Sequence, residues 1–151
     1  MPVRPPHIPP DHMRAWRGFL TAASTVVDRL GREMEEETGL PLTWYEVLLY
    51  LREAEGGRLR MHELAESLLL SRSAVTRFVD RMEEGGLVRR TDCPDDRRGT
   101  FVEATPLGIE RFMSAAPVHL RGISEHFAGL IDDGEAAVIA SAMERVSRHL
   151  A

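Results

Sequence analysis

The segment from Ser71 to Glu84 constrains this chain most, because its polar and apolar side chains separate completely at the period of an α-helix. The apolar half consists of Ala74, Val75, Phe78, Val79 and Met82. The polar half consists of Arg72, Ser73, Thr76, Arg77, Asp80, Arg81, Glu83 and Glu84. Such a helix packs one side on a core and exposes the other. Ser71 is a good N-cap, and Gly85-Gly86 are expected to end the helix.

The polar half also changes in charge along the helix axis. Its first two turns carry Arg72, Ser73, Thr76 and Arg77 and no acid, whereas the acids follow nearer the C-terminus. A helix-turn-helix contacts base edges with the N-terminal part of its second helix, where free amides also favour phosphate oxygens. An amphipathic surface helix without a ligand is the other interpretation of this segment.

A β-hairpin with a long tip is predicted after this helix. The expected strands are 87–91 and 100–104, and the loop between them, 92–99, is rich in Asp, Pro, Arg and Gly. Asp96 and Arg98 can point to one side of the tip, where the carboxylate would hold the guanidinium extended toward a minor groove. Arg97 would reach a phosphate. A simple polar turn is the alternative, but helix and hairpin together predict a winged helix-turn-helix that binds DNA.

The remaining segments read as helices, so the predicted fold is mainly α with a small β-hairpin wing. The first helix covers about 11–37, and the second, 43–53, is expected to open with a capping box of Thr43 and Glu46. A short third helix covers 62–69. Thr105 is expected to cap a fifth helix that Pro117 kinks or splits. Asp132 with Glu135 begins a sixth helix.

Charge and composition narrow the class of protein further. The chain has 151 residues and a net charge of −5, which argues against a non-specific nucleic-acid binder. Residues 71–100 nevertheless carry a net charge of +1, and every basic residue of the chain other than histidine is Arg. No apolar run reaches the roughly 20 residues of a membrane span. We expect a cytoplasmic single domain, 1–151, with a flexible Pro-rich arm over 1–10.

At this point the chain resembles the MarR (multiple antibiotic resistance regulator) family of transcription factors. The matching segments are Leu42-Thr43-Trp44-Tyr45, Leu64-Ala65-Glu66, 70–82, Gly86-Leu87-Val88-Arg89-Arg90, Asp96-Arg97-Arg98-Gly99 and Thr105-Pro106-Leu107-Gly108. The resemblance implies a homodimer with interlocked first, fifth and sixth helices. It also implies binding to a pseudo-palindromic operator, often as a repressor, with release by a small phenolic or lipophilic effector.

The resemblance further divides the chain and assigns its site residues. The DNA-binding lobe would cover 42–104, and the dimerisation helices 11–38 and 105–151. The DNA contacts would come from Ser71, Arg72, Ser73, Thr76, Arg77, Asp96, Arg97 and Arg98. Trp16, Trp44 and Tyr45 could line an effector pocket, although core packing is the other interpretation. Two positions depart from the family pattern: His62, where a small polar cap is usual, and Ala104, where Leu is common.

Other functions find little support in the sequence. No Gly-rich phosphate loop or nucleophile–base spacing indicates an enzyme, and no cofactor is predicted. His119 and His126 are seven residues apart without further metal ligands, so each is interpreted as a surface histidine. Cys93 is the only cysteine, so no internal disulfide can form, and a redox role for it stays open. The main rival is a dimer that sequesters another regulator without binding DNA itself.

Overall fold

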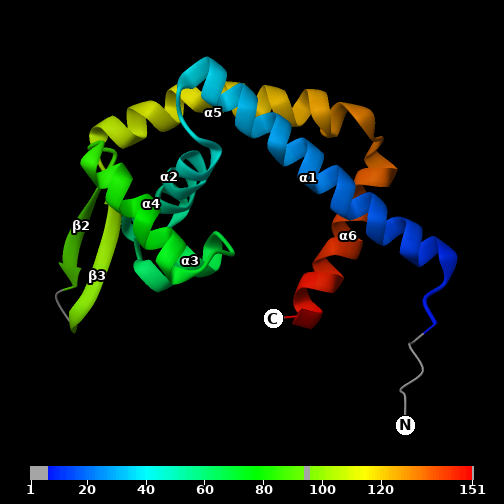
Figure 1. Cartoon of the computed structure of the whole chain (residues 1–151), viewed down its shortest axis with the longest axis horizontal. Coiled ribbons are helices and arrows are strands. Elements are labelled where there is room, and N and C mark those ends of the chain that lie inside the picture. Colours follow the sequence, from blue (N-terminus) through cyan, green and yellow to red (C-terminus); the bar gives the residue numbers. More distant parts are fainter. Residues whose placement is uncertain (1–6, 94–95, 151) are drawn as a thin grey trace, which may run out of the picture. The chain divides into compact units, whose positions relative to one another are not determined.

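The computed structural model describes the backbone of residues 7–93 and 96–150, and the side chains of these residues except 93 and 96–98. Figure 1 shows a helical chain with one small sheet. The α-helices are α1 (Pro10–Thr38), α2 (Leu42–Glu53), α3 (Met61–Ser67), α4 (Arg72–Glu84), α5 (Pro106–His126) and α6 (Asp133–Leu150). The strands are β1 (Arg58–Arg60), β2 (Val88–Cys93) and β3 (Asp96–Ala104), and two short 3-10 turns cover Glu55–Gly57 and Ala128–Leu130. The predicted fold class is confirmed.

The chain forms two compact units. The central unit comprises residues 33–121, and the terminal unit comprises the described residues of 1–32 and 122–151. The predicted lobe, 42–104, lies wholly within the central unit. Because α1 begins at Pro10, the predicted arm can extend no further than residue 9.

One hydrophobic core holds the central unit together, and α4 is seated on it. Val75, Val79 and Met82 of α4 are completely buried, as the apolar half of the sequence pattern predicted. They join buried side chains from α1, α2, α3, β2, β3 and α5, among them Leu48 of α2 and Leu64 of α3. Burying side chains of this size contributes about 1.5–3 kcal/mol each. The burial therefore fixes which face of α4 is turned outward.

The sheet has three antiparallel strands in the order β1-β3-β2. The hairpin of β2 and β3 was predicted, although its strands extend further into the loop than expected, with Asp92 opposite Thr100. Strand β1 was not predicted, since three residues are too few to show a reliable alternation. Arg60 lies opposite Phe101 in the β1–β3 register. Strand β1 therefore joins the start of α3 to the base of the wing.

Helix starts agree with the predictions in three cases and differ in two. Ser71 accepts a hydrogen bond from the Ala74 amide, and Asp132 and Glu135 exchange the two hydrogen bonds of a capping box. Thr105 accepts one from the Gly108 amide. The predicted box of Thr43 and Glu46 is wrong, because α2 begins one residue earlier and Pro41 is its N-cap without a side-chain bond. Helix α3 begins at Met61, where the Glu63 carboxylate accepts a hydrogen bond from the Arg60 amide.

Helix α5 passes through Pro117 as one element, so of the predicted kink or split, the split is wrong and the kink stays a prediction. Proline removes one helical hydrogen bond and disfavours the preceding turn. Packing on both sides compensates for this loss: Phe112 and Ala115 are buried before the proline, and Val118 packs against the core after it.

The terminal unit leaves most of its apolar side chains uncovered. Among its described residues, Leu30 is the only buried large hydrophobic side chain. The exposed ones include Trp16, Phe19, Leu20 and Val27 of α1, and Val138, Ile139, Met143 and Val146 of α6. Phe19, Val27, Val138 and Ile139 belong to the lining of an apolar groove of about 590 Å³ between α1 and α6. None of the helices in the described residues is both long enough and apolar enough to cross a membrane.

Gly108 marks a close approach between α5 and the start of the hairpin. A methyl group at this position would lie 2.0 Å from the carbonyl oxygen of Leu87 and 3.1 Å from the Leu48 side chain. That oxygen already accepts a hydrogen bond from the Thr105 amide, so it cannot move away freely. We expect Gly108→Ala to lower the free energy of unfolding by about 1–3 kcal/mol, measured by denaturant titration.

Gly85→Ala is the matched control for this substitution. Gly85 lies at the end of α4 with an ordinary helical φ of −77°. A methyl group there would meet its nearest atom at 3.4 Å, an ordinary contact. Its effect should stay within about 0.5 kcal/mol. Equal stability of the two variants would contradict the close approach of α5 to Leu87.

Candidate nucleic-acid interface

The outward face of α4 presents the polar residues that the sequence singled out. Ser71, Arg72, Ser73, Thr76 and Arg77 are all exposed. Ser71 caps the helix, and its hydroxyl lies 3.2 Å from that of Ser73. The Thr76 hydroxyl donates to the Arg72 carbonyl at 2.9 Å, which leaves its oxygen able to accept from a ligand.

Arg72 and Arg77 carry the positive charge of this face. Neither makes an ion pair with any residue whose side chain the structure describes. No acid precedes Asp80 on α4, so the first two turns are uniformly basic. Two exposed guanidiniums beside the free amides of a helix start form a surface suited to base edges and phosphates.

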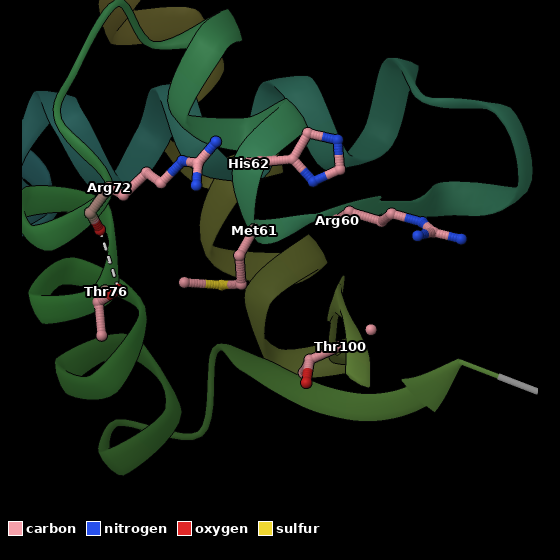
Figure 2. A pocket seen from close by; sticks show the side chains of 7 residues that line it. Arg60, Met61, His62, Arg72, Thr76 and Thr100 are labelled. Atoms are coloured by element: carbon pink, nitrogen blue, oxygen red, sulfur yellow. Dashed lines mark hydrogen bonds between the residues drawn. The ribbon is translucent and has the colours of Figure 1, made fainter. Parts of the chain in front are cut away.

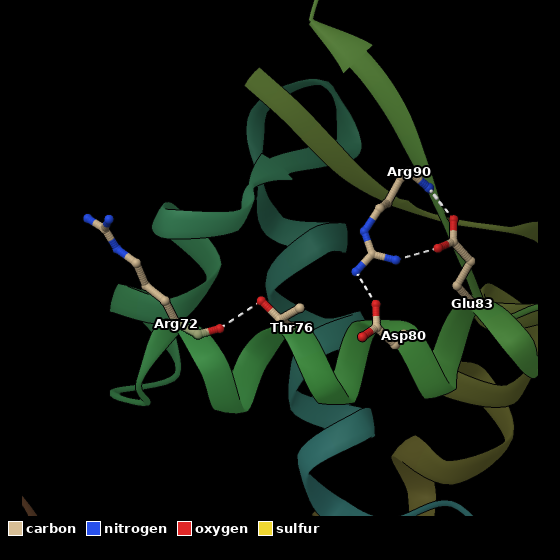
Figure 3. A network of polar contacts seen from close by, with 5 residues as sticks. All are labelled: Arg72, Thr76, Asp80, Glu83 and Arg90. Carbon is tan, nitrogen blue, oxygen red and sulfur yellow. Dashed lines mark hydrogen bonds and ion pairs between the residues drawn. The ribbon is translucent and has the colours of Figure 1, made fainter. Parts of the chain in front are cut away.

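Two acids in the second half of α4, Asp80 and Glu83, form hydrogen bonds with strand β2. Arg90 of β2 donates to Asp80 Oδ1 at 2.6 Å, and its guanidinium also binds the Glu83 carboxylate. The Arg90 amide donates to Glu83 Oε1 at 2.9 Å. Figure 3 shows this network at one end of α4, while Arg72 projects from the other end. The network links α4 to the hairpin and partly neutralises two acids beside the basic turns.

The protonation of Glu83 is coupled to this link. The backbone amide of Arg90, and then its guanidinium, lower the pKa of the Glu83 carboxyl below its ordinary value. A carboxyl group whose pKa is lower in the folded state stabilises the fold above its unfolded pKa, and this contribution disappears as the pH falls through the folded pKa. The link between α4 and β2 should therefore weaken in acid.

A basic pocket of about 470 Å³ lies beside the start of α4, between this helix and the wing. Arg60, His62 and Arg72 contribute its nitrogen-bearing side chains, and Thr76 and Thr100 contribute hydroxyls. Figure 2 shows Arg72 on α4 and Thr100 on β3 at opposite sides of it. Among the described side chains, no Asp or Glu lines this pocket. The sequence analysis noted His62 only as a poor cap and did not single out Arg60.

The wing is described in its backbone but only partly in its side chains. Asp96, Arg97 and Arg98 lie on β3, yet their side chains, like that of Cys93, are outside the described part of the chain. The predicted Asp96–Arg98 pairing and the minor-groove role of Arg98 therefore stay predictions. At the base of the wing, Arg89 of β2 pairs with Glu103 of β3 at 2.5 Å.

The suggested effector residues fall in different surroundings. Tyr45 is buried, its ring lies 4.8 Å from that of Phe112, and burial raises the pKa of its hydroxyl. Trp44 packs beside the core of the same unit, whereas Trp16 is exposed in the terminal unit. No site involving all three is described, so the effector pocket stays a prediction.

His119 is not the surface histidine that the sequence suggested. Its ring lies 4.6 Å from that of Tyr45, and its Nδ1 is buried without a hydrogen-bond partner among the described atoms. Burial lowers the pKa of this imidazole. Seven-residue spacing could not reveal this environment, because it depends on packing between α5 and α2. The described residues hold no group of three or more His, Cys, Asp or Glu able to bind a metal ion.

The Arg90 network predicts a specific loss of stability. Arg90→Gln should lower the free energy of unfolding at pH 7 by about 1 kcal/mol, because Asp80 and Glu83 lose their shared cation. Arg89→Gln is the matched control, since Arg89 is the adjacent arginine and has one carboxylate partner in Glu103. Arg89→Gln should lower the free energy of unfolding by less than about 0.5 kcal/mol.

The pH dependence of this difference tests the assignment of Glu83. The stability gap between the parent and Arg90→Gln should narrow as the pH falls below 4.5, the ordinary pKa of glutamate, because Glu83 becomes neutral. Thermal unfolding of both proteins, followed by circular dichroism between pH 3 and 7, measures this difference in stability. A gap that stays constant over this range would show that Glu83 does not contribute.

Comparison with known proteins agrees with this geometry. The family model described as MarR family matches residues 38–99. The HTH-type transcriptional regulator YkoM from Bacillus subtilis is 30% identical over 129 residues, which is 84% of this chain and 80% of YkoM.

Solved structures extend the similarity to nearly the whole chain. AbsC, a MarR family transcriptional regulator from Streptomyces coelicolor, is 32% identical with a TM-score of 0.88, over 97% of this chain and 98% of AbsC. Sco3205, from the same organism and family and solved in complex with DNA, is 31% identical with a TM-score of 0.90, over 97% of this chain and 92% of that one. The chain belongs to the MarR family of transcriptional regulators.

Proposed function

We propose that this protein is a homodimeric repressor that binds a pseudo-palindromic DNA operator through α4 and the wing. The observation that carries the proposal is the outward face of α4, where Arg72 and Arg77 are exposed and no acid precedes Asp80. In this binding mode, the first turns of α4 enter the major groove. The DNA complex of the relative Sco3205 supports DNA as the ligand.

The contacts follow from the position of each residue on α4. Arg77 lies one and a half turns into the helix and is the proposed base-reading residue, since a guanidinium can donate two hydrogen bonds to guanine. Ser71, Ser73 and Thr76 would bind phosphates or bases near the helix start. Arg98, oriented by Asp96, would enter the adjacent minor groove, and Arg97 would contact a phosphate.

The uncovered apolar surface of the terminal unit supports dimerisation. A contiguous apolar surface of this kind commonly marks a protein interface. We propose a second copy of the chain as its occupant, with residues 11–38 and 105–151 forming the dimerisation region and 42–104 the DNA-binding lobe. A twofold dimer would present two copies of α4 about 34 Å apart, one turn of DNA, and thereby match a pseudo-palindrome.

Repression and its relief complete the proposal. A dimer that occupies an operator would exclude other proteins from that site, and a small phenolic or lipophilic effector would release it. Trp44 and Tyr45 are proposed to line part of the effector site, because they combine aromatic surface with a hydroxyl and an indole N–H.

Base reading by Arg77 can be tested on an operator selected from random DNA. Arg77→Ala should weaken binding to this operator by about 1–3 kcal/mol in a fluorescence anisotropy titration, because it removes a bidentate contact to a base. Binding to random DNA should fall much less. Arg14→Ala serves as the control for lost charge, since Arg14 is exposed on α1.

Two outcomes would count against this part of the proposal. Equal weakening by Arg77→Ala on operator and random DNA would limit Arg77 to phosphate contacts. If the parent protein binds no DNA even in dilute salt, the sequestering dimer becomes the better hypothesis, since DNA binding is strongest at low salt.

Dimerisation through the apolar groove predicts a monomeric variant. Val138 is 70% exposed in the single chain, so Val138→Asp should cost little folding energy while placing a carboxylate in the proposed interface. Sedimentation equilibrium should report a dimer for the parent and a monomer for Val138→Asp. Ser141→Asp, on α6 but outside the groove lining, should remain dimeric. A dimeric Val138→Asp would place the interface elsewhere.

A further inference from the structure

Arg72 and Thr76, which line the basic pocket between α4 and the wing, belong to the proposed DNA contacts, whereas its other polar side chains have no role in them so far. Its lining comes from three separate segments of the chain. Arg60 ends β1 and His62 lies in the first turn of α3 directly after it, Arg72 begins α4, and Thr100 lies on β3. Figure 2 shows these side chains and the elements that carry them. The pocket therefore depends on the three-strand sheet, whose first strand the sequence did not reveal.

We propose that this pocket binds one phosphate of the DNA backbone, and that His62 makes this contact stronger when it is protonated. The inference rests on the proposed DNA binding. It adds the phosphate as the group that is bound and the pH as the variable that regulates binding. With α4 in a major groove and the wing in the neighbouring minor groove, one sugar–phosphate strand separates the two. That strand must cross between α4 and β3, which is where the pocket lies.

The chemistry of the lining suits a phosphate. Arg60 and Arg72 can each donate charge-assisted hydrogen bonds, and the hydroxyls of Thr76 and Thr100 can donate as well. The guanidinium carbon of Arg60 lies 5.5 Å from the centroid of the Phe101 ring, so the ring holds this side chain beside the pocket. A guanidinium positioned in advance loses less conformational entropy when it binds.

His62 adds a proton-dependent donor to the same pocket. It is exposed on α3, and Arg60 from β1 and Arg72 from α4 are the charged groups that share the pocket with it. On its own helix, the Glu63 carboxylate is already bonded to the Arg60 amide at 2.7 Å. Described residues of β3 contribute only Gly99 and Thr100, which do not titrate. A phosphate bound in the pocket would place a negative charge beside the imidazole, so phosphate binding and protonation of His62 should promote each other.

Arg58 provides a matched control within the same strand. Its guanidinium carbon lies 4.4 Å from the centroid of the same Phe101 ring, yet it does not line the pocket. Arg58→Gln and Arg60→Gln therefore remove the same charge from the same strand. A difference between the two variants reports the pocket itself rather than the overall charge.

The first experiment measures affinity for the selected operator as a function of salt. Arg60→Gln should weaken binding about fivefold or more, on operator and random DNA alike, and should reduce the salt slope by about 0.9, the value for one lost phosphate contact. Arg58→Gln should change both quantities much less. Thermal melts of each variant establish that the fold is intact. Equal effects of the two substitutions would overturn the proposal.

The second experiment locates the phosphate and tests His62. Uncharged methylphosphonates placed one at a time along the operator should reveal one position per half-site where the parent loses affinity and Arg60→Gln does not. Affinity of the parent should also rise from pH 8 to pH 6 by several-fold more than that of His62→Gln, since histidine gains its charge in this range. The proposal would be overturned if no methylphosphonate position behaved in this way, or if the parent and His62→Gln responded equally to pH.

A free anion is the other possible source of the phosphate group, and inorganic phosphate distinguishes it. His62 ring resonances should shift on addition of operator DNA at protein-equivalent concentration, and much less with millimolar inorganic phosphate. A response to inorganic phosphate alone would assign the pocket to a free anion instead. If the parent binds operator DNA and all pocket variants bind it with the same affinity, the pocket proposal fails and the proposed function stands.

Discussion

The burial of one face of α4 is the interaction on which the rest of the structure depends. Val75, Val79 and Met82 are fully buried against side chains from α2, α3 and the hairpin. Losing any of them would cost several times the energy of a surface ion pair. The helix therefore cannot rotate about its axis, and Arg72, Thr76 and Arg77 are held outward as a fixed set.

Electrostatics then separates a basic surface from an acidic chain. The net charge of −5 would oppose DNA if it were spread evenly. The acids of α4 lie in its second half, and Arg90 binds both Asp80 and Glu83 there. At the start of the helix, Arg60, His62 and Arg72 line one pocket. The fold thus gathers positive charge where the proposed DNA backbone runs.

Helical periodicity and capping residues made much of this fold predictable from the sequence. The two halves of α4, its cap at Ser71 and the capping box of Asp132 and Glu135 are local features, and all three are confirmed. Thr43 and Glu46 had the spacing of a capping box, but α2 begins at Leu42 with Pro41 as its N-cap. At Pro117, packing on the core outweighed the local preference to break the helix.

Features that depend on strand register could not be predicted. Strand β1 is stabilised by its pairing with β3, and the basic pocket forms only because this pairing brings Arg60 beside the wing. The same holds for Arg90, whose partners lie seven and ten residues away on another element. His119 looked solvent-exposed in the sequence because its contact with Tyr45 depends on how α5 packs against α2.

Dimethyl sulfate interference on an operator selected from random DNA tests the central claim most directly. The reagent methylates guanine N7 in the major groove and adenine N3 in the minor groove, so it reports which groove each element enters. Insertion of two outward faces of α4 predicts two clusters of guanine interference about 10–10.5 base pairs apart, flanked by adenine interference from the wings. Tight binding without guanine interference would contradict the account, because α4 would then not enter the major groove.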